Sequence, residues 1–435
     1  MADQKTWRIG VAGLGTVGAG LLTFLSEHPD FAPAGGRASV TGVSARSRSR
    51  PRPFDISNLP WFDDPVTLAT SPDTDIFVEL IGGLDGPAKA AVEAALNAGK
   101  PVVTANKALI AEHGAELAAL AEAKGVPLLF EAAVMGGVPA VKIVREALVG
   151  DEIRSIAGIL NGTCNYILTE MEATGRSFAE VLAEAQRLGY AESDPTMDVG
   201  GFDAAHKISI LAALAFGCAP NYAAAEIEGI EGVELLDIQL ARDLGYRIKL
   251  VASADRSPDG VLVRVHPSLA PLAHPLAQAG GALNALFIEG ARTGRIFIQG
   301  PGAGAGPTAA AVAADIADVM TGAVRPVFQT PAADLKPFVP VDPSRSVGRA
   351  YLRFLVKDQP GVIAAVSETL AEAGVSIESF LQKPVERAPN IPEGGVPIVI
   401  TTHAVAESVL KAAIEQIAGL PAVLDRPRLL RIARI

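Results

Sequence analysis

The chain has 435 residues, of which 49% are hydrophobic and 20% charged, and its formal net charge is −11. The length exceeds what one hydrophobic core supports and favours about three domains, and the composition is that of a globular protein. The negative charge argues against nucleic acid or an anionic membrane as a partner, whereas a single basic pocket would still bind a small anion.

The N-terminus and the cysteines indicate the compartment. The first eight residues, MADQKTWR, are polar and do not form a secretory signal. No run of 18 apolar residues predicts a membrane span. Cys164 and Cys218 have no metal-ligand spacing. We therefore expect a cytoplasmic protein with reduced thiols.

The first third of the chain alternates between short apolar runs and helical patterns. Such alternation predicts right-handed crossovers and a parallel sheet, and we assign it to a domain over 1–137. The predicted strands are residues 7–12, 38–44, 75–82, 101–107 and 126–134.

The pattern changes at about residue 138. Helical runs, including one over 138–148, alternate with short β-like pieces such as 153–160 and 261–267, which predicts an α+β domain over 138–300. A glycine-rich turn and a long helix over 301–325 are expected to return to the first domain. Proline-rich residues 326–345 predict a linker, and 346–435 predicts a ferredoxin-like βαββαβ unit. The predicted fold class is α/β.

A glycine pattern opens the first helix. Gly13, Gly15 and Gly18 form G-x-G-x-x-G directly after a strand. Glycine there permits a tight turn and close approach to a pyrophosphate, which the helix N-terminus then faces. The pattern predicts a Rossmann-type dinucleotide site, and the alternative is merely a tight turn. Leu14, Thr16 and Val17 complete the loop.

The end of the second strand predicts the choice of dinucleotide. An NAD site usually carries an acid there, but residues 31–54 contain none, and SARSRSRPR supplies arginines beginning with Arg46. Arginine suits a 2′-phosphate, so we predict NADP, with NAD also possible. A solvated basic loop is the alternative.

Two lysines occupy positions where a charged side chain is unexpected unless it has a function or a partner. Lys107, in TANK after the fourth strand, lies where ligands bind open α/β sheets, although it could be only a cation at a helix start. Lys207 shares a helix face with Ile210, Leu211 and Leu214 and follows Asp203 by one turn. Either the two form a structural ion pair, or Lys207 is a general acid in a cleft. His206 faces elsewhere and Cys164 lacks a nearby base, so both are expected to be structural.

Several motifs resemble homoserine dehydrogenase in their order along the whole chain: GLGTVG, TANKALIAEHG, FEAAVMGGVP, NGTCNYIL, GYAESDPTMDVGGFDAAHK and GPGAGAGPTA. KDQPGVIAAVSETLAEAGVSIES resembles an ACT domain, an amino-acid-sensing module. The resemblance implies reduction of L-aspartate 4-semialdehyde to L-homoserine in threonine, methionine and isoleucine biosynthesis, with threonine as a possible effector. With no kinase domain preceding it, the chain resembles the monofunctional form.

The resemblance also assigns residues. Lys207 matches the catalytic lysine and Lys107 a second lysine near nicotinamide and substrate, without deciding which delivers the proton. It implies dimerisation through the substrate domain, as a homodimer or homotetramer. Three acids match the substrate site, Glu192, Asp198 and Asp203; Thr104 and Gly304 join the cofactor site; and Glu131, Val134, Gly136 and Val138 match a site for a monovalent cation, Na⁺, bound mostly by main-chain oxygens.

Two rival functions remain open from the sequence. A semialdehyde dehydrogenase would use Cys164 to form a thiohemiacetal and would consume phosphate. A non-enzymatic nucleotide-binding amino-acid sensor would bind NADPH without oxidising it.

Overall fold

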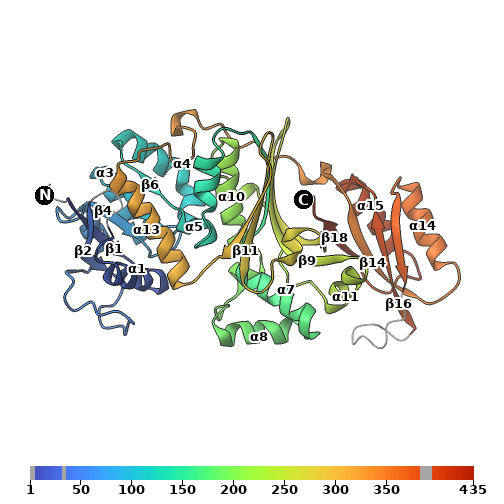
Figure 1. Ribbon diagram of the computed structural model, residues 1–435. Helices are drawn as coiled ribbons and strands as arrows, with labels where there is room; N and C mark the ends of the chain where they lie inside the picture. The colour runs from blue at the N-terminus through green and yellow to red at the C-terminus, as the bar shows by residue number, and fades with distance from the viewer. Residues whose placement is uncertain (1–4, 32–35, 383–393) are drawn as a thin grey trace.

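The computed structural model describes residues 5–31, 36–382 and 394–435 (Figure 1). Most of its strands belong to two sheets, one in the N-terminal third and one that runs from the middle of the chain to its C-terminal end. In the described part of the chain, no helix combines the length and apolarity needed to span a membrane.

The N-terminal sheet has six strands, all paired in parallel. Its order, β3-β2-β1-β4-β5-β6, reverses direction between β1 and β4, and such a reversal creates the crevice where dinucleotides bind. The prediction of a Rossmann-type sheet is confirmed. The strands are β1 (Thr6–Ala12), β2 (Arg37–Ser44), β3 (Trp61–Phe62), β4 (Ile76–Glu79), β5 (Val102–Thr104) and β6 (Leu128–Leu129).

Helices cover both faces of this sheet. Alternate residues of each strand face opposite sides: Val78 joins the apolar cluster under α1 and α13, whereas Phe77 joins the cluster under α2, α3 and α4. The helix after residue 301 thus packs on the N-terminal sheet, beside α1. These helices are α1 (Thr16–Glu27), α2 (Pro65–Thr70), α3 (Pro87–Asn97), α4 (Lys107–Lys124) and α13 (Ala305–Thr321).

Two predicted elements near the domain junction are wrong in extent. The strand expected over 126–134 ends at Leu129, and Ala132–Met135 forms a short helix, α5. The helix expected over 138–148 is α6 (Ala140–Lys142) followed by a π-helical turn at Ile143–Ala147. The reason lies in Glu131, whose buried carboxylate accepts the N–H groups of Val141 and Lys142 in α6 and so fixes the start of that helix.

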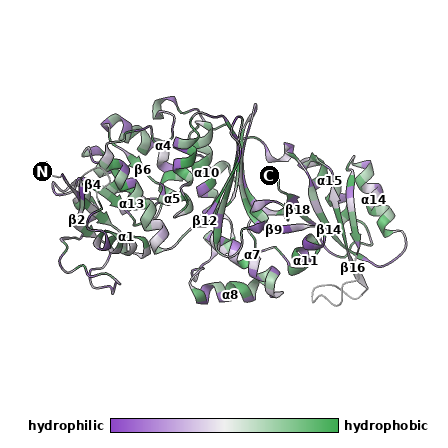
Figure 2. Ribbon diagram, viewed as in Figure 1, coloured by the Kyte–Doolittle hydropathy of each residue, from purple (hydrophilic) through white to green (hydrophobic). Residues whose placement is uncertain are grey.

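The second sheet has ten strands and carries the middle of the chain. Four of them, β8, β9, β11 and β12, have no counterpart among the strands named from the sequence. Strands β9 and β10 each extend over 12 residues. Helix α10 packs against β9 and β10, and its residues are mostly hydrophobic in Figure 2. The strands are β7 (Ile153–Ile159), β8 (Glu226–Ile227), β9 (Tyr246–Ser257), β10 (Gly260–Pro271), β11 (Leu283–Gly290) and β12 (Gly294–Pro301); the helices are α7 (Gly162–Thr174), α8 (Phe178–Leu188), α9 (Thr196–Val199), α10 (Phe202–Phe216), α11 (Leu235–Asp243) and α12 (Pro275–Gln278).

The C-terminal unit has the predicted βαββαβ order. Its strands lie in the order β18-β14-β16-β15, and the helices α14 and α15 share an apolar cluster with one face of these strands. A separate two-stranded pair, β13 with β17, lies beside them. The elements are β13 (Val347–Gly348), β14 (Ala350–Lys357), α14 (Val362–Glu372), β15 (Ile377–Gln382), β16 (Gly395–Thr402), β17 (Val405–Ala406), α15 (Glu407–Ala418) and β18 (Arg428–Ile432).

The C-terminal unit is fused to the middle of the chain by backbone pairing. β18 pairs in parallel with β10, with Ser268 opposite Arg431 and Leu269 opposite Ile432. The ten-stranded sheet is therefore continuous across both units (Figure 1). A sequence that reads as an appended domain thus contributes strands to the sheet on which α10 packs.

The proline-rich segment 326–345 packs against the protein. Phe328 is fully buried and its ring contacts that of Phe130 at a centroid distance of 5.7 Å. The Glu122 carboxylate accepts hydrogen bonds from the main-chain N–H groups of Val327 and Ala332. The segment connects two units, but these contacts hold it in place.

Candidate active site

The glycine loop leaves space where a cofactor would approach. A Cβ atom on Gly13 (φ +100°) would lie 2.2 Å from the Leu80 main chain, and one on Gly18 would lie 2.1 Å from the Gly13 oxygen. A Cβ atom on Gly15 would meet nothing within 4 Å. Two glycines therefore serve packing, and the third faces open space at the N-terminus of α1, which has no acidic residue in its first turn. The residues present fit a dinucleotide pyrophosphate.

Arg46 lies two residues beyond β2, next to this loop. The Gly13 N–H donates to the Ser44 carbonyl at 2.8 Å, which joins the glycine loop to the end of β2. Arg46 is exposed. The guanidinium of Arg52 is otherwise engaged, since it lies over the Trp61 ring and donates to nearby carbonyls, including that of Ser47.

The ends of β4 and β5 are fixed by a carboxylate that the sequence analysis missed. Glu79 is fully buried, and it accepts hydrogen bonds from the Thr104 hydroxyl at 2.6 Å and from the N–H groups of Ile81 and Gly82. Thr104 Oγ1 in turn accepts the Asn106 N–H. Glu79 lies inside the strand predicted over 75–82 and ends the observed β4; a lone acid among the apolar residues of a buried strand was the available signal. This network sets where α4 begins.

Lys107, Asp203 and Lys207 meet at one point. The Lys107 ammonium, at the start of α4, lies 2.8 Å from Asp203 Oδ1, and the Lys207 ammonium lies 2.7 Å from Asp203 Oδ2. Lys207 also donates to the Leu160 carbonyl at 2.8 Å. The Lys107 side chain is 38% exposed and that of Lys207 11%. Two lysines from different elements thus share one buried carboxylate, and the shallower one faces solvent.

The two lysines that share Asp203 have pKa values shifted in opposite directions. Burial alone would raise the pKa of Asp203, but the charges of Lys207 and Lys107 hold that pKa well below its ordinary value. Burial lowers the pKa of Lys207 from its ordinary value, and Asp203 opposes this only in part. Asp203 raises the pKa of Lys107, which is less buried. Lys207 is thus the better proton donor and Lys107 the more permanent charge.

Asn161 links Asp198 and Asp203, the two aspartates expected at the substrate site, and was not foreseen from the sequence. Its Nδ2 donates to Asp198 Oδ1 at 2.7 Å and to Asp203 Oδ2 at 2.8 Å. Its Oδ1 caps α7 by accepting the Cys164 N–H. An asparagine before a helical run is an ordinary N-cap signal, so its second task could not be predicted from the sequence. Burial raises the pKa of Asp198, and the Asn161 bond opposes that increase.

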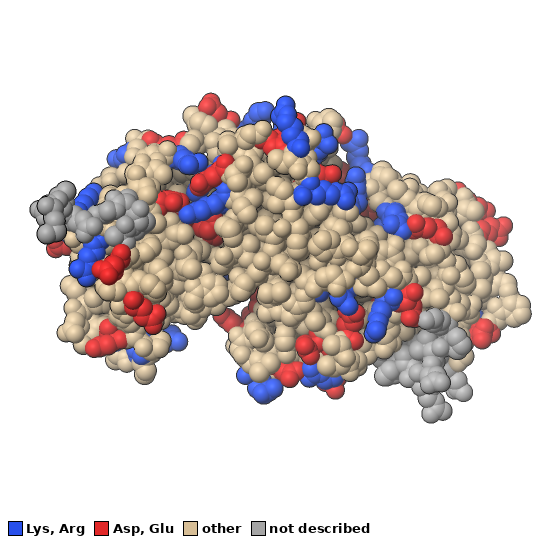
Figure 3. Space-filling model, viewed as in Figure 1, with Lys and Arg blue, Asp and Glu red and all other residues tan. Residues whose placement is uncertain are grey.

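Glu192 stands apart from this cluster. It is exposed, and its charge contributes to the raised pKa of Lys107 without a hydrogen bond between them. In Figure 3 the surface is hollowed between the lobe of the parallel sheet and the lobe of α7 and α8, with acidic atoms inside the notch. A cationic group would be attracted to such a notch.

Cys164 and His206 adjoin the cluster in structural roles. The Cys164 thiol is fully buried, donates to the Asp198 carbonyl at 3.1 Å, and burial raises its pKa well above the ordinary value. It is therefore a poor nucleophile. The His206 ring stacks on Tyr222, and burial lowers its pKa to about 4.

The residues expected to hold a cation lie on one buried turn beside the glycine-rich segment. Gly136 has φ +55°, and a Cβ atom there would lie 2.6 Å from the Gly302 oxygen, two residues before Gly304 at the start of α13. Glu131, Val134 and Val138 are buried. Burial and the nearby Asp315 raise the pKa of Glu131 to about 7. Among the described residues no group of three or more His, Cys, Asp or Glu could hold a metal ion, so the donors here would include main-chain oxygens.

These features define a class of protein. A doubly wound parallel sheet with an open glycine loop, next to a buried carboxylate of a second domain that pairs with one lysine from each domain, is the arrangement of an NAD(P)-dependent oxidoreductase.

Comparisons with known proteins agree and are more specific. Family models described as the NAD-binding domain of homoserine dehydrogenase, as homoserine dehydrogenase and as the ACT domain match residues 13–131, 139–317 and 350–422. A curated homoserine dehydrogenase of Pseudomonas aeruginosa is 43% identical over 429 residues, 97% of either chain. The crystal structure of the Thiobacillus denitrificans enzyme is 39% identical, with a TM-score of 0.92 over 100% of this chain and 99% of that one. A hyperthermophilic archaeal homoserine dehydrogenase in complex with NADPH is 28% identical, with a TM-score of 0.64 over 74% and 99% of the two chains.

The chain belongs to the homoserine dehydrogenase family. It is an oxidoreductase that interconverts L-homoserine and L-aspartate 4-semialdehyde, and it carries an NAD-binding domain and a C-terminal ACT domain. The two rival functions are thereby excluded, and the buried Cys164 agrees with the exclusion of the cysteine mechanism.

Proposed function

We propose that this enzyme reduces L-aspartate 4-semialdehyde with NADPH as its preferred cofactor and Lys207 as its proton donor. The observation that carries the proposal is the Lys107–Asp203–Lys207 arrangement, with each ammonium within 2.8 Å of one buried carboxylate. A bound nicotinamide cofactor supplies hydride to the aldehyde carbon, so the carbonyl oxygen gains charge and needs a proton.

Lys207 meets the requirements of that donor. It is buried beside the domain junction, and its pKa is lowered towards the range in which an ammonium gives up its proton readily. Asp203 and the Leu160 carbonyl fix the direction of the ammonium. After it has donated its proton, the neutral amine of Lys207 can still donate hydrogen bonds to Asp203 and to the Leu160 carbonyl.

Lys107 has a complementary task. Its raised pKa keeps it charged, and its exposed position at the carboxyl end of β5 turns it towards a ligand in the crevice. We assign it to electrostatic stabilisation of the developing alkoxide, near both the nicotinamide and the substrate.

The remaining acids suit the substrate's ammonium. Asp203 already forms ion pairs with two lysines. Asp198 has a hydrogen bond from the neutral Asn161 amide, so Asp198 and the exposed Glu192 are the carboxylates that could pair with a cation. Asp198 is half-buried, which raises its pKa, and a cationic partner would offset the cost of keeping it ionised. We therefore place the substrate's α-ammonium between Glu192 and Asp198.

Cofactor contacts follow the crevice of the parallel sheet. The glycine loop would hold the pyrophosphate, and Arg46 the 2′-phosphate, for which the NADPH complex of the archaeal relative is a precedent in the family. The proposed contact residues are Gly13, Leu14, Gly15, Thr16, Val17, Gly18, Arg46, Thr104, Lys107 and Gly304.

A sodium ion suits the turn between β6 and α6. Two buried acids, Glu131 and Asp315, lie close together, and the nearby Lys142 ammonium makes its shorter contact, 2.6 Å, with Asp318. A monovalent cation held by oxygens of Glu131, Val134, Gly136 and Val138 would supply the missing charge and brace the junction of the two domains.

Regulation and assembly complete the proposal. The ACT domain suggests an amino-acid effector, which we take to be threonine, and we expect a homodimer or homotetramer in the cytoplasm, where the two free cysteines stay reduced. Light scattering measures the oligomeric state.

The decisive experiment is cofactor oxidation with L-aspartate 4-semialdehyde. NADPH should be consumed with a higher kcat/KM than NADH, homoserine should form in equal amount, and threonine should lower the rate. Preference for NADH would overturn the cofactor assignment, and indifference to threonine would overturn the effector.

A further inference from the structure

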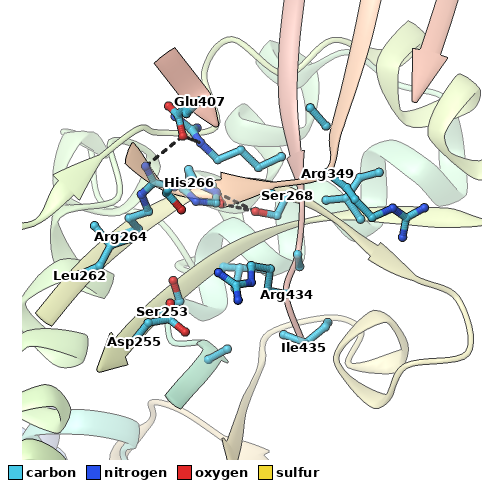
Figure 4. A pocket seen from close by; sticks show the side chains of 18 of the residues that line it. Ser253, Asp255, Leu262, Arg264, His266, Ser268, Arg349, Glu407, Arg434 and Ile435 are labelled. Carbon is cyan, nitrogen blue, oxygen red and sulfur yellow. Dashed lines mark hydrogen bonds and ion pairs between the residues drawn. The ribbon is translucent and has the colours of Figure 1, made fainter. Parts of the chain in front are cut away.

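A cavity of about 80 Å³ lies between the middle of the chain and the ACT domain (Figure 4). One wall consists of residues of β9 and β10, and the opposite wall of residues of α15, β18 and the C-terminal end. A single water needs roughly 10–15 Å³ of such space. The cavity therefore has room for a small organic molecule that would contact both units at once.

The cavity faces the side of the sheet opposite to α10. Ser253 on β9 and Arg264 on β10 line it, whereas their neighbours Ala254 and Val263 belong to the main core cluster, which includes residues of α10. Because alternate residues of a strand face opposite sides, a ligand here would lie directly behind the catalytic helix.

Most of the charged groups at the cavity already have partners. Arg264 and Arg431 both contact Glu407, at 2.9 Å and 2.6 Å, and Arg349 contacts Glu378. Glu226 is a second carboxylate for Arg264 and Arg431, at 2.8 Å and 3.6 Å, so these charged groups do not require a ligand.

Asp255 and Arg434 are different. Among the described residues, neither side chain makes a hydrogen bond or an ion pair, and the hydroxyl of the neighbouring Ser253 also has no partner. The two charged side chains point toward one another across part of the cavity (Figure 4). Burial raises the pKa of Asp255, and Arg434 is the cation that opposes this most strongly, although it lies beyond contact distance.

A separated carboxylate and guanidinium are complementary to a zwitterion. An α-ammonium matches the carboxylate, an α-carboxylate matches the guanidinium, and a small polar side chain would find hydrogen-bonding groups in Ser253 and in the His266–Ser268 pair, whose atoms are 2.7 Å apart. A purely anionic ligand would leave Asp255 repelled, and a purely cationic one would leave Arg434 unpaired.

We propose that this cavity binds a free L-α-amino acid, with its ammonium at Asp255 and its carboxylate at Arg434. The inference rests on the amino-acid regulation in the proposed function and names the place where the effector acts.

The position explains how binding would reach the active site. An effector can shift an equilibrium only as far as it prefers one conformation. This ligand would bind only while the ACT domain is docked on β10, because both units supply its contacts. The same β9 and β10 support α10, which carries Lys207.

Equilibrium dialysis with labelled L-threonine tests the site on the full-length enzyme. Saturating L-homoserine is added so that threonine cannot occupy the catalytic site. Asp255→Asn and Arg434→Gln should each weaken binding about tenfold or more, since each removes a charged hydrogen bond, and should leave the basal kcat without effector unchanged. Matched controls are Asp259→Asn, 70% exposed in the hairpin after β9, and Arg187→Gln, 70% exposed on α8.

The outcomes separate this inference from the proposed function. Unchanged threonine affinity in both cavity variants would overturn the site while leaving regulation intact. If neither L-threonine, L-methionine nor L-isoleucine binds the wild type beside homoserine, the amino-acid site is overturned, whereas the reduction of semialdehyde would be untouched. Equal losses in the exposed controls would also refute it, because charge in general would then be responsible.

Discussion

Two buried carboxylates in this enzyme hold cations from different parts of the chain, and they differ in the kind of cation. Asp203 lies between Lys107 and Lys207 at the junction with the dinucleotide domain. Glu407 lies between Arg264 and Arg431 at the junction with the ACT domain. Both carboxyl side chains are 7% exposed, so burial does not distinguish them.

The residue types give the two clusters opposite capacities. Burial lowers the pKa of Lys207, so its ammonium donates a proton more readily. Arg431 keeps its proton, since burial is outweighed by its contacts with Glu407 and its pKa is raised. Lysine ion pairs can therefore take part in proton transfer, whereas arginine pairs remain fixed charges. The first cluster suits chemistry and the second suits docking.

Replacing Lys207 tests the catalytic half of this comparison and should have the largest effect. Lys207→Ala removes a proton donor and a charge that both act in the transition state, so kcat should fall by about 10²–10⁴. NADPH affinity should barely change, because the glycine loop lies on the other domain. Steady-state kinetics and cofactor titration measure the two quantities.

Arginine at the same position makes the test sharper. Lys207→Arg keeps the charge but cannot give up its proton, so kcat should remain low. A melting curve beside the assay separates catalysis from packing, because loss of one member of a purely structural buried pair costs about 3–5 kcal/mol of stability. A folded Lys207→Ala enzyme with near-normal kcat would refute the catalytic role.

Replacing Glu407 tests the docking half. Glu407→Gln removes the shared carboxylate and leaves the two arginines only the more exposed carboxylates of Glu226 and Glu228, so the free energy of unfolding should fall by up to about 3–5 kcal/mol. Glu415→Gln, on the same helix but 67% exposed, should change it by less than about 0.5 kcal/mol. Denaturant unfolding measures both. Similar small losses for the two variants would show that the buried cluster does not hold the ACT domain.

The same cluster predicts a pH dependence. Burial alone would raise the pKa of Glu407, but Arg431 and Lys411 lower it from 4.5 to about 2. A carboxyl whose pKa is lower in the folded state stabilises the protein above its ordinary pKa, and that stabilisation is lost as pH falls. The stability gap between wild type and Glu407→Gln should therefore be full above about pH 4.5 and close towards pH 2.

The two clusters also show what a sequence can and cannot reveal. Asp203 and Lys207 are four residues apart on one helix, so their contact follows from helical geometry. The third member, Lys107, comes from a different domain, and its place beside Asp203 was expected from the resemblance alone. Glu407, Arg264 and Arg431 are distant in sequence, and no local pattern predicts that they meet.

Fold prediction failed where long-range pairing decides. Alternation of strands and helices was sufficient for the parallel sheet, because each unit packs locally. The ACT unit has its own hydrophobic periodicity and turns, so the order of its strands and helices could be predicted from its sequence. Its fusion with the central sheet depends on β18 meeting β10, which no periodicity records. That fusion also changes an obvious experiment: removing residues from Ser346 onward would expose the edge of β10, so point variants are the better test of regulation.

Arg46 extends the comparison to the cofactor, with arginine again in a fixed-charge role. Loss of a charged hydrogen bond costs about 1.5–3 kcal/mol, so Arg46→Ala should weaken NADP(H) binding about tenfold or more and leave NAD(H) nearly unchanged. Fluorescence titration with both cofactors measures the effect. Equal weakening of both would contradict the 2′-phosphate assignment, and Arg50→Ala, in the same exposed loop, controls for general charge.

The smallest expected effect concerns how Asp203 and Asp198 are held in place. Asn161→Ser keeps a good N-cap for α7 but loses the Nδ2 donor to both aspartates. A hydrogen bond to a charged group is worth roughly 1.5–3 kcal/mol, but Asp203 keeps both lysines, so only part of that energy should be lost. We expect kcat/KM to fall several-fold, with little change in melting temperature. The pH profile is the sharper measurement. Because the Asn161 bond opposes the rise in the pKa of Asp198, its removal should raise that pKa further. Asp198 must be ionised to hold the substrate's ammonium, so the acidic limb of kcat/KM should move to higher pH. A lower kcat/KM with an unmoved acidic limb would mean that Asn161 serves only the packing of α7.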